Sequence, residues 1–162
     1  MKKLIIVSDN HGDKNIEMIL DKREYDLAIH CGDSQFQYNS EIMKKFNVRV
    51  KGNCDFDNNY PNEVVIEIEG IKLFITHGHL YNIKYTFKDL CLKADELGCQ
   101  IALFGHSHQL MNETTRGIQL INSGSTAFSR SQYPNTFLEL TLENKRIIET
   151  KFILLDTFKR LK

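Results

Sequence analysis

The sequence predicts an α/β protein with one mixed sheet or two packed sheets. Three short apolar runs, Leu4 to Val7, Leu27 to Ile29 and Val48 to Val50, are each followed by polar residues. Runs of this length between turn residues are typical of buried strands. Ile16 and Ile19 lie between the first two runs at helical spacing, which favours a strand, helix, strand unit with parallel strands.

The rest of the chain predicts further strands and one more helix. Residues Val64 to Glu69 and Lys72 to Thr76 flank a turn at Glu69 and Gly70, which predicts a hairpin. Apolar residues recur on one face of a helix that we expect from Tyr85 to Leu97. Residues Ile101 to Phe104 form another apolar run, and the remainder, including Ile118 to Ile121, is typical of antiparallel strands.

Length and composition predict a single soluble domain over residues 1–162. Apolar residues make up 41% of the chain and charged residues 26%, the mixture of an ordinary globular protein. The 21 Lys and Arg residues balance the 21 Asp and Glu residues, so there is no excess of positive charge to attract a polyanion. The composition therefore argues against nucleic acid as the substrate.

The cysteines and the start of the chain predict a cytoplasmic location. Cys31, Cys54, Cys91 and Cys99 form no C-x-x-C pair, so we expect reduced thiols, with all but Cys54 buried as small apolar side chains. The apolar run that follows Met1 is too short for a signal peptide. No segment approaches the roughly 20 apolar residues that a membrane-spanning helix needs, so no membrane partner is expected.

All six histidines follow predicted strands, and they share these positions with carboxylate and amide side chains. Asp9 and His11 are two residues apart, and in extended backbone such residues point to the same side of the chain. We therefore expect both side chains to bind one metal ion. His106 and His108 repeat this spacing after a glycine, and these ligand types suit hard or borderline divalent cations.

Five short motifs, taken in order, resemble the pattern of the calcineurin-like metallophosphoesterases. The family pattern runs D-x-H, G-D, G-N-H-D/E, H and G-H-x-H, and the matching residues here are Asp9 to His11, Gly32 and Asp33, Gly52 to Asp55, His77, and Gly105 to His108. The match spans about two thirds of the chain. In its short length and its Gly-Asn-Cys-Asp variant, the chain is most similar to the small bacterial and archaeal phosphodiesterases of the family.

The resemblance implies a fold, a metal centre and a reaction. The implied fold is a two-sheet β-sandwich flanked by helices, with four layers in the order αββα. Two divalent metal ions are implied, with Mn²⁺ expected first and Ni²⁺, Fe²⁺, Co²⁺ or Zn²⁺ as alternatives. A hydroxide between the two ions then attacks the phosphate ester, and no protein side chain acts as the nucleophile.

The resemblance also assigns the ligands. Asp9, His11 and His108 are implied for one ion, Asn53, His77 and His106 for the other, and Asp33 as the bridge between them. Asp33, Asn53 and His106 are also expected to be catalytic.

Cys54 departs from the family pattern, which has a histidine there that resembles a general acid. A thiol with an ordinary pKa of about 8.5 is a poor proton donor for a leaving group at neutral pH. We therefore expect weak protonation of the leaving group, or protonation by water, and a preference for esters with good leaving groups. The role of Asp55, which would orient that histidine, is open, and Cys54 can equally be a packing residue.

Several residues near these motifs have two open interpretations. His30 can support the ligands by hydrogen bonding or do nothing, and His79 can contact the phosphate or complete a turn. The segment Asn122 to Ser125 resembles an N-x-G-S segment that lies near the metals in the family. Arg130 can meet the phosphate or be a surface residue. Tyr81, Tyr85 and Phe87 can line a substrate pocket or belong to the core.

Three functions remain open from the sequence. The first is a phosphodiesterase with a small-molecule phosphate ester as its substrate. The second is a phosphomonoesterase or nucleotidase with the same two metals. The third is a scaffold that has the fold without catalysis, similar to the retromer subunit of this family. A homodimer is also possible.

Overall fold

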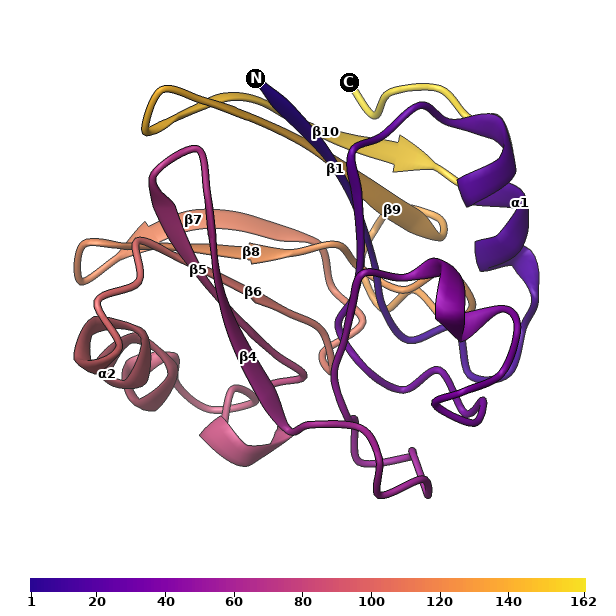
Figure 1. The fold of residues 1–162 in the computed structure, drawn as a ribbon, viewed down its shortest axis with the longest axis horizontal. Coiled ribbons are helices and arrows are strands. Elements are labelled where there is room, and N and C mark those ends of the chain that lie inside the picture. The colour runs from indigo at the N-terminus through magenta and orange to yellow at the C-terminus, as the bar shows by residue number, and fades with distance from the viewer.

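The computed structural model describes residues 1–162 and contains two five-stranded sheets that pack against each other (Figure 1). The first sheet has the order β10-β9-β1-β2-β3 and contains β1 (Lys2–Val7), β2 (Leu27–His30), β3 (Val48–Arg49), β9 (Thr136–Glu143) and β10 (Arg146–Leu154). The second sheet has the order β4-β5-β6-β8-β7 and contains β4 (Glu63–Ile68), β5 (Ile71–Thr76), β6 (Ile101–Phe104), β7 (Met111–Thr115) and β8 (Ile118–Asn122).

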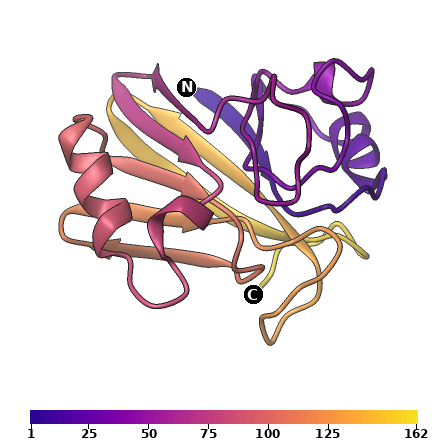
Figure 2. The same cartoon turned by 90° about the horizontal axis from the view of Figure 1, so that it is seen from below.

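Four short helices connect these strands. They are α1 (Asn15–Lys22), α2 (Lys88–Glu96) and the 3₁₀ helices η1 (Met43–Lys45) and η2 (His79–Tyr81). Figure 2 shows α1 outside one sheet and α2 outside the other. The expected four layers in the order αββα are therefore confirmed. None of these helices is both long and apolar enough to cross a membrane.

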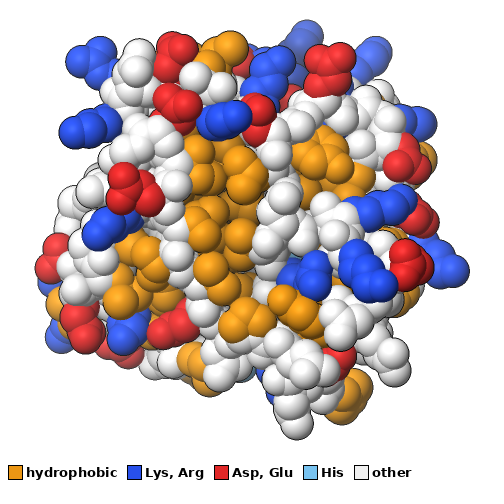
Figure 3. Space-filling model, viewed as in Figure 1, with side chains coloured by type: hydrophobic (Ala, Val, Ile, Leu, Met, Phe, Trp, Pro, Cys, Tyr) orange, Lys and Arg blue, Asp and Glu red, His pale blue; other side chains and the backbone are white.

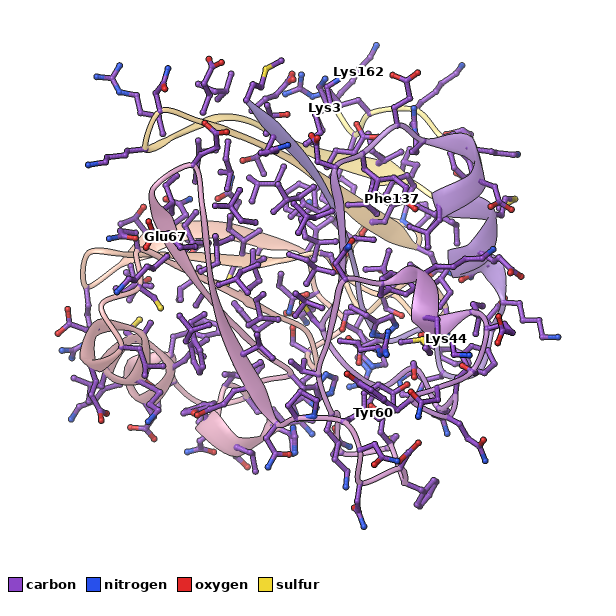
Figure 4. The ribbon with its side chains drawn as sticks, viewed as in Figure 1. Lys3, Lys44, Tyr60, Glu67, Phe137 and Lys162 are labelled. Carbon is purple, nitrogen blue, oxygen red and sulfur yellow. The ribbon has the colours of Figure 1, made fainter.

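The strand residues alternate between two apolar layers. In β1, Leu4 and Ile6 point into the core between the sheets, whereas Ile5 and Val7 pack under α1. A separate cluster lies between α2 and the second sheet. Phe137 of β9, labelled in Figure 4, belongs to the layer under α1 and is fully buried. Because each fully buried Leu, Ile or Phe contributes about 2 kcal/mol, these layers supply most of the stability of the fold.

Some apolar side chains near the edge formed by β3 and β4 are only partly buried. The strand β3 has only two residues, and Leu27, Val64 and Ile66 are only partly buried against the core between the sheets. Figure 3 shows apolar side chains gathered on this face beside β4.

The sequence predicts the strands closely but misplaces the start of the second helix. The helix expected from Tyr85 begins at Lys88, because the chain first makes a turn at Asn82, whose backbone is left-handed (φ 55°). Tyr85 lies on this turn and is 86% exposed, so it is not a core residue. Cys31, Cys91 and Cys99 are buried as expected.

Parallel strand pairing determines where the site forms. The strands β1, β2 and β3 pair in parallel, and so do β5, β6 and β8. The carboxyl ends of parallel strands meet at one edge of a sheet, so the loops that follow them lie together. Contacts between the two sheets join these loops, since the backbone N–H of His106 donates to Asp9.

Candidate metal centre

The backbone of the site is strained at several polar residues. Asp9, His11, His106 and His108 have φ values of 56°, 46°, 68° and 57°, all in the left-handed region. The expected extended backbone is therefore wrong for both pairs, and tight turns bring their side chains together instead. A left-handed residue with a side chain costs about 1 to 2 kcal/mol, and such residues cluster at functional sites.

Asp9, His11 and His108 form a group whose facing atoms are all acceptors. His108 donates its Nδ1 proton to the Phe128 carbonyl at 2.8 Å, and His11 Nδ1 faces Gln35 Oε1 at 3.0 Å. Each ring therefore turns an Nε2 lone pair inward. The two Nε2 atoms are 3.2 Å apart, and Asp9 Oδ1 lies 3.2 Å from that of His108 and 3.8 Å from that of His11. Lone pairs this close repel one another unless a cation lies among them.

Asp33, Asn53 and His77 form a second group of the same kind. His77 donates its Nδ1 proton to the Cys31 carbonyl at 2.7 Å. Its Nε2 atom faces Asp33 Oδ2 at 3.1 Å and Asn53 Oδ1 at 3.1 Å. Burial by itself lowers the pKa of His77, but the hydrogen bond to Asp33 and the charge of Asp9 raise it above its ordinary value. Positive charge is favoured at this position.

Asp9 shows most directly that the site suits a cation. Its side chain is fully buried, and Oδ2 accepts hydrogen bonds from Ser8 Oγ at 2.6 Å and the His106 N–H at 3.0 Å. Oδ1 is buried without a hydrogen-bond partner. Burial tends to raise the pKa of Asp9, but the histidines and Ser8 lower it overall, so the carboxylate is charged. An unpaired buried charge costs several kcal/mol, and a divalent cation would remove that cost.

Two glycines allow the loops to approach these carboxylates. A Cβ atom at Gly52 would lie 2.0 Å from Asp33 Oδ1, and one at Gly105 would lie 2.6 Å from Asp9 Oδ2. No larger residue fits at either position without moving a carboxylate. The glycines that open two of the sequence motifs are therefore required by close packing.

His106 and His79 lie beside these groups. The His106 ring centroid is 5.2 Å from that of His77. Unlike His77, neither His106 nor His79 belongs to the close groups of possible ligand atoms. Burial and the charges of His77 and Lys84 lower the pKa of His106 to about 4, so its ring is neutral at pH 7. Nδ1 of His79 is buried without a partner, and this ring lies 6.2 Å from His106. The structure therefore brings the other six predicted ligands together in the two groups, whereas the ring of His106 lies beside them.

Cys54 lies at the edge of the site and is partly exposed. Its backbone N–H donates to Asp33 Oδ1 at 2.8 Å, and its Sγ atom is close enough to His11 and Asp33 to be a ligand. Burial and the Asp33 carboxylate raise the pKa of the thiol. Cys54 is therefore a neutral thiol that faces the site.

Asp55 organises the loops that carry Asp33 and Asn53. Its Oδ2 atom accepts from the N–H groups of Gly52 at 2.7 Å and Asp33 at 2.8 Å, and its Oδ1 atom accepts from Gln35 at 2.8 Å. The sequence left the role of Asp55 open because the histidine that it would orient is absent. The structure assigns it to the backbone instead.

Replacing Asp55 with Ala is expected to destabilise the protein and weaken the site. Three N–H groups lose their acceptor, and those of Gly52 and Asp33 are buried. Each unsatisfied buried donor costs about 1 kcal/mol or more, so we expect a loss of about 2 kcal/mol or more in the free energy of unfolding. Urea denaturation measures this loss. Asp57→Ala is the matched control, because Asp57 also accepts N–H bonds but lies where water can replace it. Equal stability of the two variants would contradict the role of Asp55.

Further hydrogen bonds support the ligand loops. His30 is buried and neutral, with a pKa that burial lowers to about 3, and it hydrogen-bonds to Asn10 and to the N–H of Gly32. Asn122 donates to the Gly105 carbonyl at 2.9 Å. Ser125 donates to the Asp9 carbonyl at 2.8 Å, so the segment from Asn122 to Ser125 lies against the site.

Phe128 is a contact that the sequence does not indicate. Its carbonyl accepts from His108, and its ring, which is 61% exposed, lies 5.7 Å from the ring of His11. A carbonyl contact does not depend on residue type, so no sequence signal could have identified it.

Comparison with known proteins supports the same interpretation. Residues 1–145 match the calcineurin-like phosphoesterase superfamily domain. The probable metallophosphoesterase YsnB of Bacillus subtilis is 39% identical over 144 residues, which cover 87% of this chain and 85% of that protein. The phosphodiesterase MJ0936 of Methanocaldococcus jannaschii is 25% identical over 144 residues, covering 75% and 82%. The chain therefore belongs to the calcineurin-like phosphoesterase superfamily.

A solved structure confirms the fold. Vacuolar protein sorting 29 from Cryptosporidium parvum superposes with a TM-score of 0.80 at 19% identity, over 99% of this chain and 94% of that chain. Similarity at this identity establishes the architecture and leaves the reaction to be argued from the site.

Proposed function

We propose that this chain is a phosphodiesterase that hydrolyses a small phosphate ester with two divalent metal ions, of which Mn²⁺ is the first candidate. The proposed ligands are Asp9, His11 and His108 for one ion, Asn53, His77 and His106 for the other, and Asp33 between them. The observation that carries the proposal is the unpartnered, buried Oδ1 atom of Asp9 beside two inward-facing histidine lone pairs. Bound at these positions, the ions would supply positive charge that acidifies the attacking water and neutralises the phosphoryl oxygens.

The residues of the chain keep this site in one arrangement. The carbonyls of Cys31 and Phe128 fix the Nδ1 protons of His77 and His108, so the Nε2 lone pairs remain turned inward. The raised pKa of Cys54 keeps its thiol neutral, so it is not a nucleophile. Leaving-group protonation then comes from water, which favours esters of acidic alcohols. The four free cysteines support a cytoplasmic location as part of the proposal.

The proposal is tested by comparing a diester and a monoester with the same leaving group. The Mn²⁺-loaded protein is expected to release p-nitrophenol from bis(p-nitrophenyl) phosphate at least tenfold faster, in kcat/KM, than from p-nitrophenyl phosphate. The similarity to the phosphodiesterase MJ0936 supports this preference. A faster reaction with the monoester would make the protein a phosphatase and refute the diesterase proposal.

A further inference from the structure

A groove of roughly 540 Å³ borders the loop that carries His106 and His108. Ser107, between these two histidines, forms part of its wall. Asn122 fixes this position by donating to Ser107 Oγ at 3.1 Å. The groove therefore begins at the backbone of the candidate metal centre.

The groove combines an apolar surface with two cations. Ile83, Phe87 and Met111 contribute apolar side chains, and Lys84 and Arg130 contribute positive charge. Both cations are exposed, and neither forms an ion pair or a side-chain hydrogen bond. Glu113 is the one carboxylate in the lining, so the groove carries an excess of positive charge.

Both cations lie close to the candidate metal centre. The backbone N–H of Arg130 donates to the His108 carbonyl at 2.9 Å. Lys84 lines the same groove as Ser107, which lies between His106 and His108. An anion in the groove would therefore be near the phosphate that the metal centre is proposed to bind.

A second groove of roughly 560 Å³ can be compared with the groove beside His106 and His108. It lies on the outer face of the first sheet and also contains several charged residues. Two of its cations are paired, since Arg23 Nε lies 3.1 Å from Glu139 and Lys151 Nζ lies 2.7 Å from Glu149, whereas Lys3 and Lys22 form no ion pair. Of the two grooves, only the one lined by Ser107 lies next to the proposed reaction centre, and both of its cations are unpaired.

We infer that this groove binds the alcohol part of the phosphodiester substrate and selects an alcohol that has both a ring and a second anionic group. The ring would lie against Phe87 and Met111, and the anion between Lys84 and Arg130. A nucleoside that carries an additional phosphate has this chemistry. The inference rests on the proposed phosphodiesterase function and names the substrate class that this site prefers.

Two esters that differ by one phosphate test this preference. They are thymidine 5′-(p-nitrophenyl phosphate) and the same compound with a 3′-phosphate. The protein is expected to hydrolyse the 3′-phosphorylated ester with about tenfold higher kcat/KM, the magnitude of a charge-assisted contact. In a Lys84→Ala, Arg130→Ala double variant this ratio should fall to about one.

A matched variant and a binding measurement complete the test. Lys88→Ala removes an exposed lysine that begins α2 and does not line the groove, so it should leave the ratio unchanged. Calorimetry should show that thymidine 3′,5′-bisphosphate binds about tenfold more tightly than thymidine 5′-phosphate, and that the double variant loses this difference.

The outcomes separate the two proposals. Equal hydrolysis of both thymidine esters, or a preference that survives in the double variant, would overturn the groove assignment and leave the phosphodiesterase intact. Tight bisphosphate binding that depends on Lys84 and Arg130, with no hydrolysis of any diester, would support the groove and refute the phosphodiesterase.

Discussion

The Asp33→Asn variant is expected to show at least about a thousandfold lower activity in the proposed diesterase reaction. The carboxylate lies between the two groups of side chains, with Oδ2 3.1 Å from His77 Nε2 and 3.8 Å from His11 Nε2. The hydrogen bond and charge of His77 outweigh burial and lower the pKa of Asp33, so it is fully ionised at pH 7. Asparagine keeps the volume of this side chain but removes the charge that both proposed ions share.

The activity of this variant is measured with bis(p-nitrophenyl) phosphate and saturating Mn²⁺, and circular dichroism verifies its fold. Asp21→Asn is a suitable control, because Asp21 is exposed on α1 and its nearest ion-pair distance, to Lys45, is 3.8 Å. The control should keep full activity. A folded Asp33→Asn variant with more than a tenth of the wild-type rate would show that the reaction does not depend on a charge at this position.

Removal of metal is expected to lower both activity and thermal stability. Treatment with a chelator should reduce diester hydrolysis by at least about a hundredfold, and Mn²⁺ should restore it. Stability should also rise on adding Mn²⁺, because a cation relieves the repulsion around the unpartnered Asp9 Oδ1. At a free ion concentration of about 100 times Kd, one site adds about 2.7 kcal/mol, which raises Tm by about 5 to 10 °C for a chain of this size.

The change in Tm separates binding from catalysis. An Asp9→Asn variant should show a smaller increase in Tm on adding Mn²⁺, because it lacks the charged oxygen that is proposed to bind one of the two ions. If both proteins gave the same increase in Tm, the ion would be binding somewhere other than the candidate metal centre.

The sequence predicts which residues meet at the site because the meeting point follows from topology. Asp9, Asp33 and His106 each come shortly after a strand that pairs in parallel with its neighbour. Once those strands are recognised, the carboxyl ends within each sheet must lie at the same edge, and the packing of the two sheets brings the two edges together. No knowledge of side-chain geometry is needed for this step.

The sequence does not predict how the site is supported, because the supporting contacts involve the backbone. Asp55 accepts hydrogen bonds from N–H groups, and Phe128 contributes a carbonyl. The left-handed conformation of Asp9 and His11 is also hidden, since neither is a glycine. Similarly, the helical spacing of apolar residues begins before α2 does, because the turn at Asn82 precedes the helix and the spacing does not indicate that turn.

The central claim, a site for two divalent ions that hydrolyses phosphodiesters, is tested most directly by titrating metal-stripped protein with Mn²⁺. Bound metal and hydrolysis of bis(p-nitrophenyl) phosphate are measured at each point. We expect activity to rise until two ions are bound per chain and then to stay constant. Two bound ions without hydrolysis of any ester would indicate a scaffold, and full activity in the stripped protein would contradict the metal centre itself.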